Sequence, residues 1–157
     1  MGLDMYLEKR VRLYRLQDKE WKKDIRLFSD DQPKVYKKLE SPWLSFEVGY
    51  WRKANQIHHW FVENVQDGED DCKEYRVTID QLRQLYDLCE QILKEPNEKK
   101  RLKLAKELLP TQEGFFFGTI DYDEYYFETL KDTTEMLEGL FKEEDAEEAD
   151  YVYSSSW

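Results

Sequence analysis

The sequence is poor in the residues that most chemistry and cross-linking in small proteins require. It has two cysteines, two histidines, six glycines and four prolines among 157 residues. The cysteines, Cys72 and Cys89, are too few for a disulfide scaffold and lack the spacing of a zinc site. No glycine-rich phosphate loop is present, and no Ser/His/Asp arrangement is evident. These absences favour a binding protein over an enzyme, with no cofactor and no metal.

Long apolar runs are also absent. No run approaches the roughly 18 residues that a membrane-spanning helix needs. The first residues include an early acid, Asp4, and no basic segment, unlike a secretory signal. Two unpaired thiols are typical of a reducing compartment. The sequence therefore predicts a cytoplasmic protein with no membrane partner.

Basic residues are scarce in one part of the chain. Residues 119–150 carry 13 acidic side chains and two basic ones, whereas the charges of residues 1–118 balance. The net charge of −11 therefore belongs to one acidic segment beside a neutral body. Because carboxylates repel phosphate backbones, no direct nucleic-acid partner is expected. The aromatic content of 15% is unlike that of disordered chains and predicts a folded core.

Hydrophobic periodicity predicts a single α+β domain over residues 1–157, with a small antiparallel sheet packed against about four helices. The expected strands are 2–13, 43–50, 74–78, 114–118 and the C-terminal residues 151–157, the last as an edge strand. The expected helices are 51–66, 79–94, 98–109 and 122–142. The charge run 143–150 predicts a solvated acidic linker within this domain.

Local signals refine these elements. Thr78 and Gln81 have the spacing of a capping box at a helix start. The inner stripe of the helix 98–109 is expected to consist of Leu102, Ala105 and Leu109. Gly49 indicates a bulge or a close approach in its strand. The polar residues 14–42 are expected to pack on the body through apolar side chains, with a turn at 30–33. Those side chains are Trp21, Ile25, Leu27 and Phe28.

The best candidate for a ligand site is the stretch 50–60, which combines two cations, an amide, both histidines and three large aromatics. It spans the end of an expected strand and the start of an expected helix, with no capping Ser, Thr or Asp before it. An uncapped helix N-terminus beside Arg52 and Lys53 suits a phosphate. Trp51 would then stack on a base, and Asn55 would read its edge.

A plainer structural interpretation of this stretch stays open. Arg52, Asn55 and His59 share one helix face at i, i+3 and i+7 if the helix begins at residue 51. However, the aromatics can equally be core residues, the cations solvated and the histidines simply packed. The two histidines are adjacent, so they diverge on a helix and are poor metal ligands.

Two further segments have alternative roles. Asp121 and Asp123 suit a helix cap, and the same carboxylates could bind a cation or perform acid–base work. The run 114–118 suits a buried strand, and it could also lie beside a ligand. In that second case Phe116 and Tyr122 line the ligand site.

Four stretches resemble a family of small proteins encoded by bacteriophages and prophages. They are the opening MGLDMYL, GYWRKANQIHHWFV at 49–62, LLPTQEGFFFG at 108–118 followed by Tyr122 and Asp123, and the closing YSSSW. The resemblance implies a phage origin, action in the cytoplasm of a bacterial host, and modulation of that host, including its defence systems.

Three functions follow as expectations. The first is a binding protein that sequesters a small phosphate-bearing nucleotide, such as a signal of host defence. Its expected ligand-binding residues are Trp51, Arg52, Lys53, Asn55, His59, Phe116 and Tyr122. The second is an inhibitor whose acidic segment imitates nucleic acid and blocks a basic site on a host protein.

The third expected function is a nucleotide phosphodiesterase. It would use His58 or His59 with Asp121 or Asp123. A homo-oligomer is a further expectation, because an aromatic C-terminal edge strand can pair with the sheet of a second chain.

Overall fold

The protein has an α+β fold built on a four-stranded antiparallel sheet. The computed structural model describes residues 2–12, 28–29, 32–33 and 43–157. The sheet has the order β4-β1-β6-β5. Its strands are β1 (Asp4–Arg12), β4 (Trp43–Arg52), β5 (Tyr75–Val77) and β6 (Asp150–Ser156). A separate pair joins β2 (Phe28–Ser29) to β3 (Gln32–Pro33). The predicted fold class and the single domain with four helices are confirmed.

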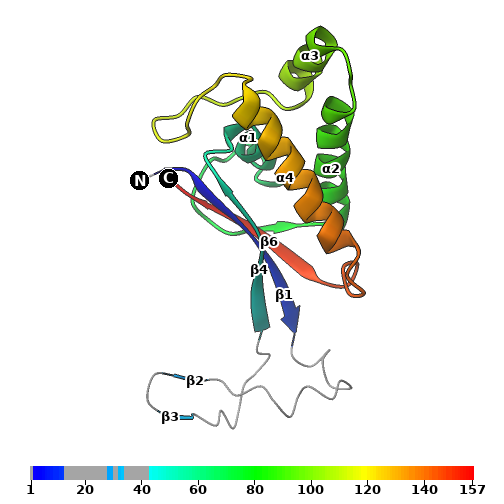
Figure 1. The fold of residues 1–157 in the computed structure, drawn as a ribbon. Coiled ribbons are helices and arrows are strands. Elements are labelled where there is room, and N and C mark those ends of the chain that lie inside the picture. The colour runs from blue at the N-terminus through cyan, green and yellow to red at the C-terminus, as the bar shows by residue number, and fades with distance from the viewer. Residues whose placement is uncertain (1, 13–27, 30–31, 34–42) are drawn as a thin grey trace.

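The helices gather on one side of the sheet, as Figure 1 shows. They are α1 (Asn55–Val65), α2 (Ile79–Leu93), α3 (Glu98–Leu108) and α4 (Glu124–Phe141). Alternate residues of the two central strands point into the core, where Met5, Leu7, Tyr151 and Tyr153 are fully or almost fully buried. The period-two pattern of these strands therefore reflects one covered and one less buried face.

The strand prediction is wrong at two places. The C-terminal strand β6 is not at an edge, because it pairs with β1 on one side and with β5 on the other. It therefore offers no free edge for a second chain. Residues 114–118 form a turn rather than a strand, and the short strand β5 completes the sheet instead.

The helix starts and stripes were predicted more closely. Thr78 forms both bonds of the predicted capping box with Gln81. Asp123 caps α4 by accepting a hydrogen bond from the backbone N–H of Tyr126. Ala105 and the following Leu109 are buried as predicted, whereas Leu102, expected on the same inner stripe, is exposed.

The strand β4 is irregular at the predicted glycine. Leu7 of β1 faces Gly49, and the next residue of β1 faces Glu47, so Val48 is an extra residue in β4. A Cβ atom on Gly49 would lie 2.7 Å from the sulfur of Met136. The glycine therefore lets α4 approach the sheet closely, and both parts of the prediction are confirmed.

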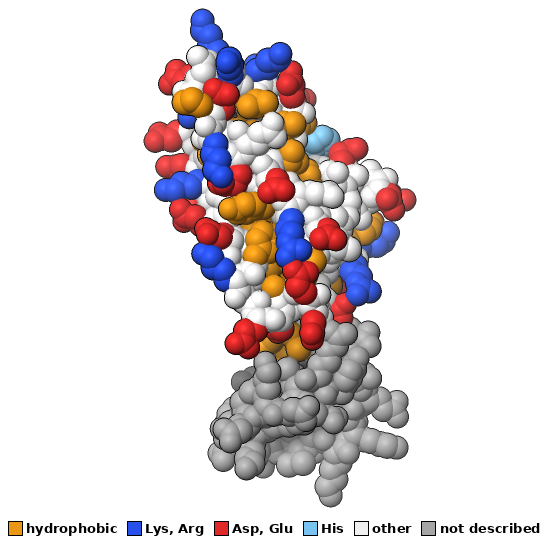
Figure 2. Space-filling view, turned by 90° about the vertical axis from the view of Figure 1, so that its right-hand side faces the viewer, with side chains coloured by type: hydrophobic (Ala, Val, Ile, Leu, Met, Phe, Trp, Pro, Cys, Tyr) orange, Lys and Arg blue, Asp and Glu red, His pale blue; other side chains and the backbone are white. Residues whose placement is uncertain are grey.

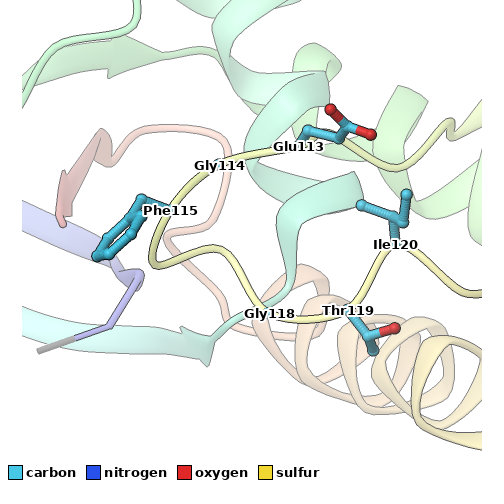
Figure 3. A pocket seen from close by; sticks show the side chains of 6 residues that line it. All are labelled: Glu113, Gly114, Phe115, Gly118, Thr119 and Ile120. Atoms are coloured by element: carbon cyan, nitrogen blue, oxygen red, sulfur yellow. The ribbon is translucent and has the colours of Figure 1, made fainter.

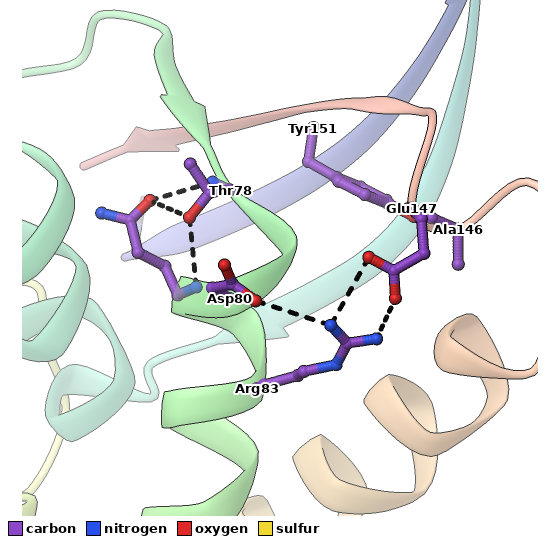
Figure 4. Close-up of polar contacts among 7 residues, drawn as sticks. Thr78, Asp80, Arg83, Ala146, Glu147 and Tyr151 are labelled. Atoms are coloured by element: carbon purple, nitrogen blue, oxygen red, sulfur yellow. Dashed lines mark hydrogen bonds and ion pairs between the residues drawn. The ribbon is translucent and has the colours of Figure 1, made fainter.

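Residues 143–150 are held on the body and are not a solvated linker. Glu143 and Asp145 both form ion pairs with Lys9, a buried residue of β1. Glu147 pairs with Arg83 of α2, and the buried Tyr151 donates a hydrogen bond to the carbonyl of Ala146. Figure 4 shows the pairing of Arg83 with Glu147 beside the capping box of α2. The body cations thus neutralise much of this acidic run.

Some predictions concern residues outside the described part of the chain. Trp21, Ile25 and Leu27 are among these residues, as are Asp30 and Asp31 of the expected turn. Within the described part, none of the helices is both long and apolar enough to cross a membrane.

Candidate functional site

The N-terminus of α1 is buried and does not form the predicted phosphate site. The helix begins at Asn55 rather than at residue 51, and Ala54 before it offers no side-chain cap, as predicted. However, Ala54, Asn55 and Gln56 are all almost fully buried. A bound phosphate at a helix start needs open backbone N–H groups, and none of these residues faces solvent.

Asn55 fastens the loop that precedes α4 to the start of α1. Its side-chain amide donates hydrogen bonds to the carbonyls of Phe117 (3.1 Å) and Thr119 (2.8 Å). Its side-chain oxygen accepts a hydrogen bond from the backbone N–H of Gln112 at 3.1 Å. These three bonds occupy the amide, so Asn55 organises a loop here and does not present an edge to a base.

Trp51 is a core residue. It is 5% exposed, and its indole N–H donates a hydrogen bond to the hydroxyl of Thr133 at 2.9 Å. Its ring packs edge-on against Phe61. Because both faces lie within the protein, the predicted stacking of Trp51 on a ligand would require the core to open.

Arg52 and Lys53 are exposed, and both lie outside α1. Arg52 is the last residue of β4, so it does not share a helix face with Asn55 and His59 as predicted. Lys53 has a φ of +54°, a left-handed conformation, and its N–H donates to the carbonyl of Leu3 at 2.7 Å. The Tyr125 hydroxyl donates to the carbonyl of Arg52 at 2.5 Å. The two cations therefore sit on a fixed backbone.

The loop of residues 113–120, called here the aromatic loop, lies beside these cations. Phe115 is 95% exposed, whereas Phe117 is buried and Phe116 is half-buried between them. The loop borders an open hollow of about 600 Å³. In Figure 3 the Phe115 side chain points away from the neighbouring helices, at the opposite end of the loop from Ile120.

The backbone of the aromatic loop is fixed even though its tip is exposed. The N–H of Leu3 donates to the carbonyl of Phe116 at 3.1 Å, which ties the loop to the residues before β1. Gly118 has a φ of +90°, and a Cβ atom there would lie 3.1 Å from the Cβ of Lys53. The Phe117 ring packs edge-on against the half-exposed Trp157. The loop therefore presents Phe115 from a rigid base.

Sequence reasoning missed a series of polar contacts beneath this loop, in which His58 and Tyr153 are buried and Asp70 is partly exposed. His58 is fully buried, and its Nδ1 lies 2.7 Å from the hydroxyl of Tyr153. Its Nε2 lies 2.9 Å from one carboxylate oxygen of Asp70. The other oxygen accepts a hydrogen bond from the side-chain amide of Gln112 at 3.1 Å. Burial is the main influence on the His58 pKa and lowers it from its ordinary value.

The remaining predicted residues are dispersed. His59 is half-buried on α1, and Tyr122 accepts a hydrogen bond from the N–H of Thr111 at 3.2 Å. Asp121 bonds the Thr119 hydroxyl at 2.8 Å. Neither histidine is paired with Asp121 or Asp123, because His58 bonds Asp70 instead. The expected ligand-binding set is therefore not gathered in one pocket, although Arg52, Lys53 and Phe116 do lie together around the aromatic loop.

Metal and thiol chemistry have little support in the described part of the chain. No group of three or more potential ligands there could hold a metal ion. Cys89 is buried, and burial raises the pKa of its thiol. Cys72 is an exposed free thiol in the loop after α1. The two cysteines are thus neither a disulfide nor a metal site.

The acidic charge is displayed mainly along α4. Glu124, Glu128, Asp132 and Glu135 are all exposed at spacings of three or four residues, which places them on one helix face. Figure 2 shows the side of the molecule with α2 and α3, where apolar side chains form a broken strip bordered by both charge types. On that side, polar and charged side chains therefore interrupt the apolar surface.

Comparisons with protein-family models, with curated proteins and with solved structures found no match for this chain.

Proposed function

We propose that this chain is a binding protein that contacts a partner protein through the aromatic loop. The observation that carries the proposal is the 95% exposure of Phe115 on a loop whose backbone is held by hydrogen bonds. An exposed phenylalanine contributes little to folding, yet its burial against a partner stabilises a complex by about 1.5–3 kcal/mol. Rigid aromatic anchors of this kind dominate the energy of many interfaces.

The surroundings of the loop define the partner's surface. Half-exposed Trp157 packs against Phe117 of the same loop and adds apolar surface there, and half-exposed Ile120 adds apolar surface at the far end of the loop from Phe115. Arg52 and Lys53 border the loop. The complementary surface is an apolar pocket with carboxylates at its rim. The resemblance to phage proteins adds that the partner is a protein of the bacterial host, met in its cytoplasm, and that binding inhibits it, as anti-defence proteins do.

A capture experiment tests this proposal. Wild type, Phe115→Ala and Phe46→Ala would each be used to capture proteins from a lysate of the bacterial host. Phe46 is 51% exposed on β4 and serves as a matched control. Phe115→Ala should weaken binding of the captured protein by about 1.5–3 kcal/mol, roughly 10- to 150-fold, and Phe46→Ala should not. Equal capture by all three proteins would contradict the proposal.

A phosphate-bearing nucleotide is a second candidate ligand of the same surface. The observation that favours it is the open hollow of about 600 Å³ beside Phe115, with Lys53 in contact with Gly118. Phe115 would stack on the base, and Lys53 and Arg52 would hold the phosphate. Native mass spectrometry followed by denaturation would release such a ligand intact. A Lys53→Glu variant that retained the ligand would argue against this candidate.

The acidic-mimic function receives weaker support. Glu143, Asp145, Glu147 and Asp150 form ion pairs with cations of the body, so they are not displayed as free charges. Within the described residues 119–150, the exposed carboxylates along α4 are then the main group that could imitate a phosphate backbone. Binding through them would weaken steeply with added salt, whereas binding through Phe115 would not.

A further inference from the structure

We propose that Asp70, His58 and Tyr153 form a positioning device for the aromatic loop rather than a catalytic triad. The three side chains come from separate segments: Asp70 from the loop after α1, His58 from α1 and Tyr153 from β6. The inference rests on the proposed function only in that it treats the aromatic loop as the contact surface. The hydrogen bonds among Asp70, His58 and Tyr153 are present in the fold whether or not a partner binds.

The donors and acceptors of these three side chains allow one arrangement of protons. Asp70 as a carboxylate can only accept, so the His58 Nε2 must carry a hydrogen and donate it. The neutral Nδ1 is then an acceptor, and it takes the hydrogen of the Tyr153 hydroxyl at 2.7 Å. The opposite tautomer would place the Nε2 lone pair against the carboxylate at 2.9 Å, which is repulsive.

A catalytic role does not fit the burial of these groups. The order carboxylate, imidazole and hydroxyl matches that of nucleophilic triads. However, Tyr153 is fully buried, and its ring stacks on Phe61 with the centroids 3.9 Å apart. His58 is fully buried as well. A substrate therefore has no path to the hydroxyl or to the imidazole.

Two contacts connect the Asp70–His58–Tyr153 hydrogen bonds to the aromatic loop. The second oxygen of Asp70 accepts from Gln112, the residue before the loop begins. The rings of His58 and Phe117 pack in a T-shaped arrangement, with centroids 5.1 Å apart and an interplanar angle of 85°. Together with the three bonds of Asn55, these contacts fix both arms of the loop. Asp70 thus acts on Phe115 through Gln112 and the loop backbone.

Hydrogen exchange of the full chain tests this role without any partner. The reporting amides are those of Gln112, bonded to Asn55, and Phe117, bonded to the carbonyl of Gly114. Asp70→Ala should accelerate their exchange about tenfold and leave the amides of α2 unchanged, because the opening is local. Asp71→Ala is the matched control, since Asp71 pairs with the exposed Lys73 and should not affect the loop.

A conservative variant separates positioning from general support of the fold. Asp70→Asn keeps an oxygen for His58, and a rotated Gln112 amide can bond its new N–H group. It should restore slow exchange of the loop, which a loss of packing alone would not predict. Loop exchange within twofold of wild type in Asp70→Ala, or no rescue in Asp70→Asn, would overturn the inference. If exchange behaves as expected but Phe115→Ala binds normally, only the proposed function fails.

Discussion

At the scale of single residues, His58 has the environment that most changes its chemistry. Burial disfavours its charged form, and this outweighs the pull of Asp70, so its pKa lies below the ordinary 6.5. Between that lowered value and 6.5, the unfolded chain binds a proton that the folded chain does not. The contribution of His58 to stability is therefore fully present above pH 6.5 and is lost as the pH drops through this window.

Thermal unfolding as a function of pH measures this effect. We expect the melting temperature of wild type to fall between pH 7.5 and 5.5. His58→Gln should melt lower than wild type at pH 7.5, and its melting temperature should depend little on pH in the same range. His59→Gln is the control and should keep the slope of wild type. A slope that survives in His58→Gln would assign it to another group.

Single residues also show why part of the site could not be predicted. A sequence stretch with Trp51, Asn55 and two histidines looks like a ligand site because these side chains can stack and form hydrogen bonds. The same properties let them satisfy one another when buried. The partner of His58 is Asp70, twelve residues away and beyond the end of α1, and no local spacing indicates that pair.

At the scale of elements, the acidic run after α4 gains its order from one buried cation. Lys9 is 6% exposed, and Glu143 and Asp145 both bond its ammonium group. A buried ammonium without partners is strongly destabilising. The ion pairs to Lys9 therefore fix residues 143–150 against β1. The composition of these residues alone predicts a solvated linker.

Neutralising the two partners of Lys9 should reveal this anchoring. We expect Glu143→Gln combined with Asp145→Asn to lower the free energy of unfolding by roughly 3 kcal/mol, because the ammonium stays buried without a counter-charge. Glu144→Gln, an exposed neighbour, should stay within about 0.5 kcal/mol of wild type. Urea unfolding monitored by tryptophan fluorescence measures both changes. Equal stability of the two variants would mean that the ion pairs contribute nothing.

The capping box of α2 allows a second prediction for an element. The Thr78 hydroxyl accepts from the backbone N–H of Gln81, and the Gln81 side chain accepts from the N–H of Thr78. Thr78→Ala removes the first bond and should lower the free energy of unfolding by about 1 kcal/mol. Thr78→Ser should remain close to wild type, because serine keeps the hydroxyl. Urea unfolding that shows equal losses in both variants would rule out capping as the cause.

Elements differ in how well the sequence predicts them. The helix α2 was predicted almost to the residue because a capping box and a regular apolar stripe agree. The run 114–118 was predicted as a strand because its three phenylalanines are apolar, yet they have no period of their own. In the structure they face different surroundings: Phe115 is in solvent, Phe116 is half-buried and Phe117 is in the core. Short apolar runs carry no periodicity that could distinguish these outcomes.

At the scale of the whole molecule, the sheet joins the two ends of the described chain. The strand β1 pairs with β4 and with β6, so residue 4 lies opposite residues 52 and 156. Figure 1 shows the N- and C-termini side by side next to the loop before α4. The surface around Phe115 therefore depends on residues from both ends of the sequence, including Leu3 and Trp157.

Truncation tests this dependence directly. A chain that ends at residue 149 lacks β6, so β1 loses one of its two neighbours, β5 loses its only partner in the sheet, and the core loses Tyr151 and Tyr153. Since β6 lies between β1 and β5, the four-stranded sheet cannot form without it. We therefore expect this chain to show no cooperative thermal transition by circular dichroism. Removing Trp157 alone should lower stability by only about 1 kcal/mol, the contribution of one aromatic pair. If the shorter chain unfolded cooperatively, β6 would contribute little to the stability of the fold, contrary to its central place in the sheet.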